Sequence, residues 1–211
     1  MADLRRFQHP RFARAYERTS RESEARGTGE HRARMLDGVA GRVIEIGAGN
    51  GLNFGHYPPA VTGVVAVEPE DHLRATATRA AAGAPVPVTV VTGHADTLPA
   101  EDASFDAAVV SLVLCSVPDP ATALTEVRRV LRPGGQLRFY EHVRSRRAAL
   151  GLLGDLVTPV WSRVAGGCHL NRDLAASIRA AGFAIEAIER FGYRPVRLGP
   201  SQAHILGVAT A

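Results

Sequence analysis

The chain has 211 residues, of which 45% are hydrophobic and 22% charged, values that exclude wholesale disorder and indicate one globular domain over residues 1–211. All 25 basic residues are arginine, so the pI is near 9.7 although the formal net charge is only +4. The arginines are scattered rather than arranged in a stripe, which argues against a nucleic-acid partner, and no window approaches the roughly 20 apolar residues of a membrane span.

The chain opens with two helical patterns. Residues 3–26 are rich in Arg and Glu with aromatic residues interleaved, and residues 29–39 read as a second helix. We expect residues 1–40 to form an N-terminal helical cap. The opening residues contain no apolar stretch of signal length, which favours a cytoplasmic location.

Apolar runs of strand length then alternate with helical or loop segments. The runs lie at 42–47, 63–68, 86–92, 105–113 and 136–143. This alternation predicts parallel strands with crossover helices, and the near-continuous Val, Ile and Leu suits strands that are buried on both faces. Two more helices are expected at 118–131 and 172–181, and the segments FAIEAIERF and QAHILGVAT read as a terminal strand pair. The fold class is therefore α/β, with a seven-stranded, mostly parallel sheet and helices on both faces.

Residues 144–170 interrupt this alternation of predicted strands and helices. The segment is too long for an ordinary connection, and long insertions are usually lids or binding loops. It follows the fifth strand, on the side where open α/β sheets bind ligands. We expect a lid whose apolar face includes Trp161, or, equally, a face that packs on the sheet.

A glycine-rich turn follows the first strand in VIEIGAGNGLNF, residues 43–54. A P-loop would need a lysine, and the chain has none; a dinucleotide fingerprint would need a third glycine where Leu52 stands. The pattern is instead E-x-G-x-G-x-G, formed by Glu45, Gly47, Gly49 and Gly51. This form lets the backbone approach a ligand that lacks a pyrophosphate.

Two acidic residues follow at the ends of later strands. Glu68 ends the second strand at about the 20-residue spacing expected of a ribose-binding acid. Asp96 follows the third strand in GHAD, where an adenine amino group could donate to it, although it could also cap a helix.

In this order and at strand ends, these signals resemble motifs I, II and III of class I S-adenosylmethionine-dependent methyltransferases, followed by FDAAVVSLVLCSV and EVRRVLRPGGQLRFYEHV. The resemblance implies a Rossmann-like fold and S-adenosylmethionine as cofactor, with the glycines around the methionine part, Glu68 on the ribose and Ala95–Asp96 on the adenine. The cofactor residues so implied are Glu45, Gly47, Ala48, Gly49, Gly51, Asn53, Glu68, Pro69, Ala95, Asp96, Ser111 and Leu112.

A narrower resemblance rests on GNGLNFGHYPP, LVLCSV, LRPGG, EHV, GCHLNRD and HILGVA. From about residue 40 onward, these motifs are similar to those of animal methyltransferase-like proteins that methylate alkyl thiols. Those proteins begin with an apolar membrane-associating segment, whereas this sequence begins with a charged helix. The resemblance implies a thiol acceptor, and the apolar face of residues 144–170 favours a hydrophobic one. We therefore expect a small, fairly apolar acceptor, with thiol sulfur as the first expectation and an amine or hydroxyl as the second. A phospholipid or quinone-type methyltransferase, which would bind lipid vesicles strongly through 144–147 and the lid, and a cofactor-binding protein that does not methylate stay open. For the chain itself we expect no transmembrane segment and at most weak contact with a membrane surface.

His142, at the end of the fifth strand, is the candidate general base, with a structural role as the alternative. The residues expected around the substrate are Tyr16, Tyr57, Cys115, His142, Trp161 and His169. His169 could instead cap the helix that follows. Cys115 and Cys168 form no disulfide framework and no metal-binding spacing, so we expect no metal and expect Cys115 only to line the pocket. The sequence does not indicate an oligomeric state.

Overall fold

The structure is a computed structural model that describes residues 4–194 and 201–211. Residue 3 of the expected first helix, and residues 1–3 of the expected cap, lie outside the described residues. Within them, seven strands form one sheet in the order β3-β2-β1-β4-β5-β7-β6. The strands are β1 (Gly41–Ile46), β2 (Val61–Val67), β3 (Val88–Val91), β4 (Phe105–Ser111), β5 (Leu131–His142), β6 (Ala184–Tyr193) and β7 (Gln202–Thr210).

The first five strands pair in parallel, and β7 lies antiparallel between β5 and β6. The predicted mostly parallel, seven-stranded sheet is therefore confirmed. From β1 the chain runs outward through β2 to β3 and then crosses back to β4 on the other side of β1. The carboxyl ends of β1 and β4 therefore form the switch point where sheets of this kind bind ligands.

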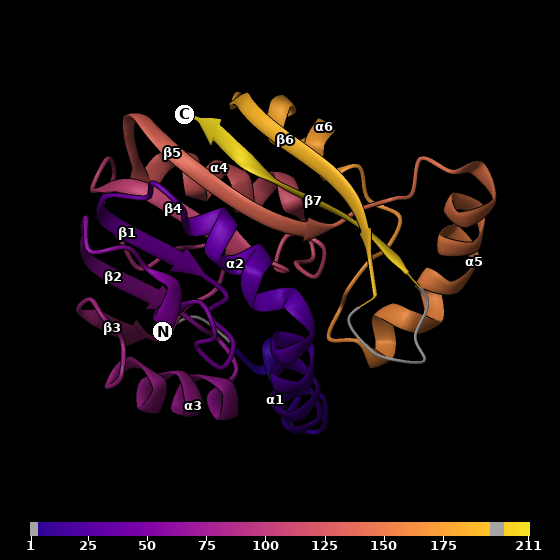
Figure 1. Cartoon of the computed structure of the whole chain (residues 1–211), viewed down its shortest axis with the longest axis horizontal. Coiled ribbons are helices and arrows are strands. Elements are labelled where there is room, and N and C mark those ends of the chain that lie inside the picture. Colours follow the sequence, from indigo (N-terminus) through magenta and orange to yellow (C-terminus); the bar gives the residue numbers. More distant parts are fainter. Residues whose placement is uncertain (1–3, 195–200) are drawn as a thin grey trace.

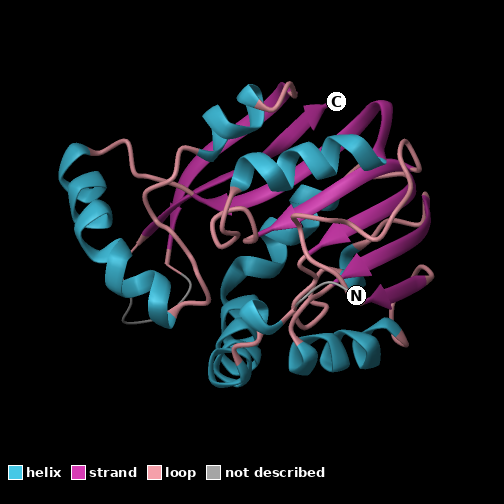
Figure 2. Ribbon diagram, turned by 180° about the vertical axis from the view of Figure 1, so that it is seen from behind, coloured by secondary structure: helices cyan, strands magenta, loops and turns pink. Residues whose placement is uncertain are grey.

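Helices cover both faces of the sheet. The helices are α1 (Pro10–Ser23), α2 (Gly29–Leu36), α3 (Asp71–Ala81), α4 (Pro120–Val130), α5 (Ala148–Val164) and α6 (Leu174–Ala180), with short turns η1 (Arg5–Phe7), η2 (Glu24–Thr28) and η3 (Phe54–His56). Seen from behind, α4 and α6 lie on one face, whereas α2 lies on the other (Figure 2).

Alternating strand residues supply the two cores. Ile44 of β1 and Val110 of β4 belong to the core beneath α4 and α6, whereas Val43 and Val109 belong to the core beneath α2. Successive side chains of a strand point to opposite faces, so strands covered on both faces need apolar residues at every position. This is why the strands read as continuous apolar runs.

Local signals define where helices begin. Asp119 accepts hydrogen bonds from the backbone N–H groups of Ala121 and Thr122, with Pro120 in the first turn of α4. Glu70 caps α3 in the same way by accepting from the Leu73 N–H. These caps fix the start of each crossover helix just beyond a strand end, where the ligand side of the sheet begins.

Two segments extend beyond the layers. The N-terminal pattern forms α1 and α2, joined by η2, and α1 lies beside the strand ends (Figure 1). The 144–170 segment contains α5, which stands apart from the helices that cover the sheet (Figure 1). Eight large apolar side chains of α5 are exposed, among them Leu152, Leu156 and Val160. Among the described residues, no helix is both long enough and apolar enough to cross a membrane.

Candidate active site

Two adjoining cavities lie at the carboxyl edge of the sheet. The first, of about 400 Å³, is lined by strand ends β1, β2 and β4 together with η1 and α1. The second, of about 350 Å³, lies between α1, the ends of β5 and β7, and the segment that follows α5. Phe12, Tyr16, Leu112 and Ser116 line both cavities. A ligand in the first cavity would therefore be separated from one in the second only by these shared side chains.

The glycine-rich loop and Glu68 form one wall of the first cavity. Gly49 has a φ of +57° and lines this cavity, so the backbone itself faces the ligand space. The Gly49 N–H donates to Oε2 of Glu68 at 2.7 Å, and the Glu70 N–H donates to Oε1 at 2.9 Å. Burial raises the pKa of Glu68 to about 7, although these two hydrogen bonds lower it. Each carboxylate oxygen keeps a further lone pair for a ligand hydroxyl.

Asp96 directly follows His94 and Ala95, which line this cavity, but it is not itself a lining residue. Its Oδ2 accepts from Arg6 at 2.6 Å. Its Oδ1 is buried and, within the described residues, has no hydrogen-bond partner. A buried carboxylate oxygen without a donor is costly, and a ligand amino group would satisfy it. Together with the glycine cradle and Glu68, this oxygen fits the adenosine part of S-adenosylmethionine.

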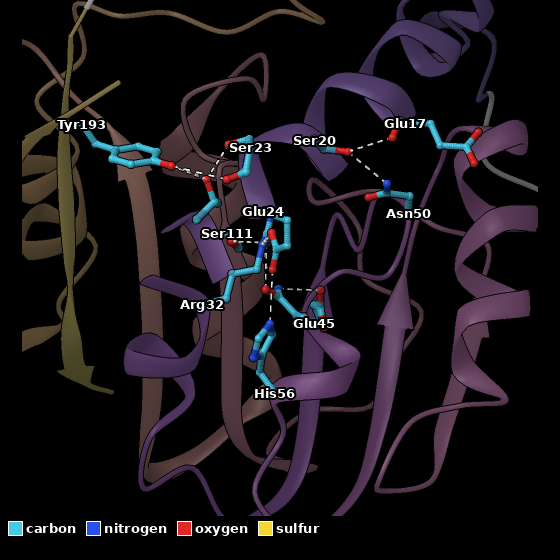
Figure 3. A network of polar contacts seen from close by, with 12 residues as sticks. Glu17, Ser20, Ser23, Glu24, Arg32, Glu45, Asn50, His56, Ser111 and Tyr193 are labelled. Atoms are coloured by element: carbon cyan, nitrogen blue, oxygen red, sulfur yellow. Dashed lines mark hydrogen bonds and ion pairs between the residues drawn. The ribbon is translucent and has the colours of Figure 1, made fainter. Parts of the chain in front are cut away.

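A buried arginine connects the N-terminal helices to the strand ends (Figure 3). Arg32 of α2 forms an ion pair with Glu24 at 3.1 Å and donates to Ser111 Oγ at 3.0 Å and to Asn53 Oδ1 at 2.8 Å. Asn53 in turn donates to Glu45 at 2.8 Å. The network fixes η2 and α2 against the ends of β1 and β4, and thereby holds α1 over the two cavities.

This network accounts for predicted site residues that lie behind the cavity wall. Tyr57, expected near the substrate, lines neither cavity, because its buried hydroxyl donates to Glu45 at 2.8 Å. Glu45 and Asn53 likewise hold the loop from behind. Burial raises the pKa of Glu45 to about 7, against the opposing effect of hydrogen bonds from Tyr57 and Asn53. Gly51 faces the Phe54 ring rather than the cavity.

The other predicted cofactor residues mostly line the first cavity. Those that do are Gly47, Gly49, Glu68, Pro69, Ala95, Ser111 and Leu112, whereas Ala48 and Asp96 lie just outside its lining. His169 lines this first cavity rather than the second, and its ring Nδ1 lies 2.6 Å from the Gly167 carbonyl oxygen. Tyr16, which was expected around the substrate, lines both cavities.

The second cavity brings together residues from three separate parts of the chain. Cys115 follows β4, His142 ends β5, and Cys168 follows α5; Trp161 of α5 lines the same cavity. His142 Nδ1 lies 3.6 Å from Cys115 Sγ and 3.5 Å from Cys168 Sγ. Burial is the largest single influence on the pKa of His142 and lowers it, but Cys115 and the negative charge of Glu141 are among several influences that together raise it, so the net direction is upward. His204, which also lines this cavity, has a pKa driven far below its ordinary value by burial.

Leu112, which lies between the two cavities, has a strained backbone conformation. Leu112 has a φ of +61°, which is rare for a residue with a branched side chain, and its N–H donates to the Tyr140 carbonyl at 2.7 Å. Outliers of this kind persist only where the surroundings enforce them, and they cluster at functional sites. Here the strain places a leucine side chain against both cavities.

Two residues that the sequence analysis did not select hold the loop that carries Cys115. The buried carboxylate of Glu141 accepts the backbone N–H groups of Val113 and Leu114 at 2.9 Å and of Cys115 at 3.1 Å. Arg172 donates to the carbonyls of Leu114 and Val117, both at 2.7 Å. Both residues belong to motifs that the sequence analysis had noted, Glu141 to EHV and Arg172 to GCHLNRD.

The segment that carries Cys168 approaches the same loop closely. The His169 N–H donates to the Cys115 carbonyl at 2.8 Å. A Cβ added to Gly167 would lie 2.7 Å from the Ser116 carbonyl oxygen, so only glycine permits this approach. The two cysteines are thus brought together by backbone contacts on both sides.

Comparison with known proteins adds sequence relatives to this geometry. A family model described as a methyltransferase domain matches residues 44–139. The thiol S-methyltransferase TMT1B of Homo sapiens is 36% identical over 180 residues, which are 82% of this chain and 73% of that protein. The human thiol S-methyltransferase TMT1A is 30% identical over 171 residues, covering 79% of this chain and 69% of that protein.

Solved structures match over nearly the whole chain. A SAM-dependent methyltransferase of Thermotoga maritima, described as a possible histamine N-methyltransferase, has a TM-score of 0.71 and 26% identity, and covers 95% of this chain and 96% of its own. A putative methyltransferase of Bacillus halodurans has the same TM-score at 18% identity, covering 85% of this chain and 96% of its own. The segment matched by the family model contains residues that line the first cavity, among them Gly49, Glu68 and Leu112.

Proposed function

The chain belongs to the family of S-adenosylmethionine-dependent methyltransferases that includes the thiol S-methyltransferases, and we propose that it methylates the sulfur of a small, fairly apolar thiol held in the second cavity. The observation that carries this proposal is the pair of adjoining cavities. The first fits the cofactor, and the second opens from it past Phe12, Tyr16, Leu112 and Ser116.

S-adenosylmethionine supplies a sulfonium methyl group that is already activated, so the protein must mainly align donor and acceptor and exclude water. Gly47 and Gly49 would hold the methionine part, and Glu68 would accept hydrogen bonds from the ribose hydroxyls. Asp96 Oδ1, which has no hydrogen-bond partner among the described residues, would accept from the adenine amino group. The side chains that line both cavities would then lie between the cofactor and the acceptor.

The lining of the second cavity supports a thiol over an amine. Its described lining residues include Arg32 and many apolar side chains but no Asp or Glu. An alkyl ammonium would find no counter-charge there, and burying an unpaired charge is expensive. A thiol is small and weakly polar, and its thiolate form is compatible with a nearby guanidinium.

The acceptor must lose its proton, because the thiolate is the nucleophile. We propose that His142 promotes this loss. Of the two histidines that line the second cavity, His142 has a raised pKa, whereas the strongly lowered pKa of His204 makes it a poor proton acceptor.

We further propose that residues 1–40 act as a cap and residues 144–170 as a lid. Side chains of α1 line both cavities, and Trp161, Val164 and Ala165 line the second. Closure of such segments would exclude water from the transferring methyl group. Hydrogen exchange that slows in both segments when cofactor and thiol are added would support this role, whereas slowing confined to other segments would oppose it.

The exposed apolar face of α5 supports a proposed weak contact with anionic membrane surfaces. Arg144, Arg146 and Arg147 precede the helix, and arginines of this kind are attracted to anionic lipid headgroups. Co-sedimentation with phosphatidylserine vesicles tests this contact, and we expect it to be weaker for a Leu152→Ser/Leu156→Ser variant. Equal sedimentation of both proteins would exclude the contact.

We propose a reducing, cytoplasmic setting for the protein, because neither cysteine forms a disulfide.

The experiment that tests the proposed function is formation of S-adenosylhomocysteine from the cofactor in the presence of a panel of thiols, amines and phenols. A thiol-dependent product is expected. Product formed only with a phospholipid or a quinone would favour the rival lipid or quinone-type methyltransferase. Absence of product with every acceptor would favour a cofactor-binding protein that does not methylate.

A further inference from the structure

Three potential metal ligands face one another in the second cavity. Cys115 Sγ lies 3.7 Å from Cys168 Sγ, and His142 Nδ1 lies 3.6 Å from the first sulfur and 3.5 Å from the second. Among the described residues, these three form the cluster of Cys, His, Asp or Glu whose ligand atoms all lie within 4.8 Å of one another. Both sulfurs and the ring nitrogen are therefore close enough together for one metal ion to bind all three.

The two sulfurs and the Nδ1 atom form a triangle whose sides match the distances between three ligand atoms in tetrahedral zinc coordination. Zinc binds cysteine sulfur at about 2.3 Å and histidine nitrogen at about 2.0–2.1 Å, so tetrahedral angles place two sulfurs about 3.8 Å apart and sulfur and nitrogen about 3.5–3.6 Å apart. The observed 3.7, 3.6 and 3.5 Å agree with these edges. A disulfide would instead require the two sulfurs to lie about 2.05 Å apart.

We propose that Cys115, His142 and Cys168 bind one Zn²⁺ ion, and that its fourth coordination position faces the second cavity and binds the sulfur of the acceptor thiol. The inference rests on the proposed thiol methylation for the identity of the fourth ligand, but the metal site itself stands on the geometry of this chain. Three protein ligands with one open position are typical of catalytic rather than structural zinc sites.

The surroundings hold each ligand in place, as metal ligands usually require. Glu141 fixes the backbone of Cys115 through three N–H groups, and the His169 N–H binds the Cys115 carbonyl. Gln202 lines the second cavity together with His142. The His142 ring also packs on His204 with ring centroids 4.6 Å apart.

The same placement explains why local spacing in the sequence gives no metal motif. The ligands are 27 and 26 residues apart along the chain and come from the loop after β4, the end of β5 and the loop after α5. They are brought together by the sheet register, by the hydrogen bonds of Glu141 and Arg172 to the loop of Cys115, and by the close backbone approach at Gly167. The expectation of no metal rested on local spacing alone.

The chemistry balances without an oxidant or reductant. A hydroxide on the open position takes the thiol proton and leaves as water while the thiol sulfur binds Zn²⁺ as thiolate. That sulfur then forms a bond to the methyl carbon, the bond between this carbon and the sulfonium sulfur breaks, and its electron pair stays on the sulfur of S-adenosylhomocysteine. The thioether produced is neutral, a weaker ligand than thiolate, and dissociates. In this scheme His142 does not take the thiol proton itself. Its Nδ1, which lies beside the two sulfurs, binds the zinc ion that promotes the loss of this proton.

The test is metal binding by tag-free, reduced protein, measured without reference to activity. We expect one equivalent of Zn²⁺ per chain by elemental analysis, removed by a chelator and restored by zinc alone. With Co²⁺ as probe, thiolate-to-metal charge-transfer absorption should appear in the wild type and be lost in Cys115→Ser and Cys168→Ser. His169→Ala is the matched control, since it removes a neighbouring imidazole outside the triangle and should retain the absorption.

A second measurement separates the two proposals. Adding an alkyl thiol to the Co²⁺ protein should change the visible spectrum if its sulfur occupies the fourth position, and an alcohol of the same skeleton should not. Stoichiometric metal binding without thiol methylation would contradict the proposed function and leave the metal site standing. Wild-type protein that binds no more Co²⁺ or Zn²⁺ than the Cys115→Ser/Cys168→Ser variant, or a Cys115–Cys168 disulfide in fully active protein, would overturn the metal site. Thermal unfolding of each variant checks that it is folded.

Discussion

The backbone N–H of Gly49 donates a hydrogen bond to the Glu68 carboxylate at 2.7 Å, joining the glycine-rich loop after β1 to the end of β2. The two residues are 19 positions apart in the chain and both line the first cavity. The contact orients the carboxylate while leaving lone pairs for a ligand. It also makes the loop and the acid one unit, so a change in either should affect cofactor binding.

Replacing Glu68 by alanine should weaken S-adenosylmethionine binding by about 2–3 kcal/mol, because two charge-assisted hydrogen bonds to the ribose are lost. Isothermal titration calorimetry measures the change directly. Glu22→Gln, on the exposed side of α1, is a control that should bind as the wild type does. Unchanged affinity in the Glu68 variant would rule out its assignment to the ribose.

Cofactor affinity should also depend on pH. Burial raises the pKa of Glu68 from 4.5 to about 7, so in the ligand-free protein the carboxyl becomes protonated as the pH falls below about 7. Because the carboxylate is the form that accepts both ribose hydroxyls, the dissociation constant should rise below pH 7, by at most tenfold per pH unit, and level off above pH 8. Calorimetry at pH 6, 7 and 8 measures this.

The Glu68→Gln variant is the control for this pH dependence. It should bind weakly at every pH, because an amide does not titrate. Glu45 also has a pKa of about 7 but lines neither cavity, so any dependence that survives in the variant would point to Glu45 instead. For stability the sign is the reverse: the folded, ligand-free chain holds these protons more tightly, so its free energy of unfolding should fall as the pH rises from 4.5 to about 7.

Gly49→Val should abolish cofactor binding. The residue has a φ of +57°, and a side chain there would enter the first cavity and press on Tyr16. Gly55→Ala is the matched control from the same loop region, because a Cβ at that position meets nothing within 4 Å. Binding to the valine variant with wild-type affinity would mean that this loop is not the cofactor cradle.

His142→Ala should lower kcat/KM for alkyl thiols by about 10²–10⁴-fold, whether the imidazole acts as a base or as a ligand. Thiols of low pKa should suffer least, since they are already partly ionised at neutral pH. Steady-state kinetics across thiols of graded acidity measures this. An equal loss for all of them would limit His142 to a structural role. Rescue by high pH would favour the base, whereas loss of bound metal would favour the ligand.

The sheet and its cofactor edge could be predicted from the sequence because their signals are local. Each strand is a short apolar run, and Gly49, Glu68 and Asp96 directly follow strands whose ends must meet in a parallel sheet. The hydrogen-bond network behind the first cavity could not be predicted from such local signals. Tyr57 and Asn53 appear beside the glycines in sequence, but their contacts with Glu45 and Arg32 depend on how α2 packs.

The second cavity was harder to predict for a similar reason. Glu141 immediately precedes His142, yet its role is to bind the backbone of residues 113–115 across the sheet edge. Cys168 reaches Cys115 only because Gly167 permits close backbone approach. Contacts between distant segments of this kind have no periodicity or spacing in the sequence.

The most direct test of the central claim is to supply S-adenosylmethionine with an isotopically labelled methyl group to three acceptors that share one carbon skeleton: an alkyl thiol, the matching alcohol and the matching amine. Mass spectrometry then locates the label. The account predicts labelled methyl thioether and an equal amount of S-adenosylhomocysteine from the thiol, and no methylated product from the alcohol or the amine. Label found on nitrogen or oxygen instead of sulfur would contradict it, as would no transfer to the thiol by protein that binds the cofactor.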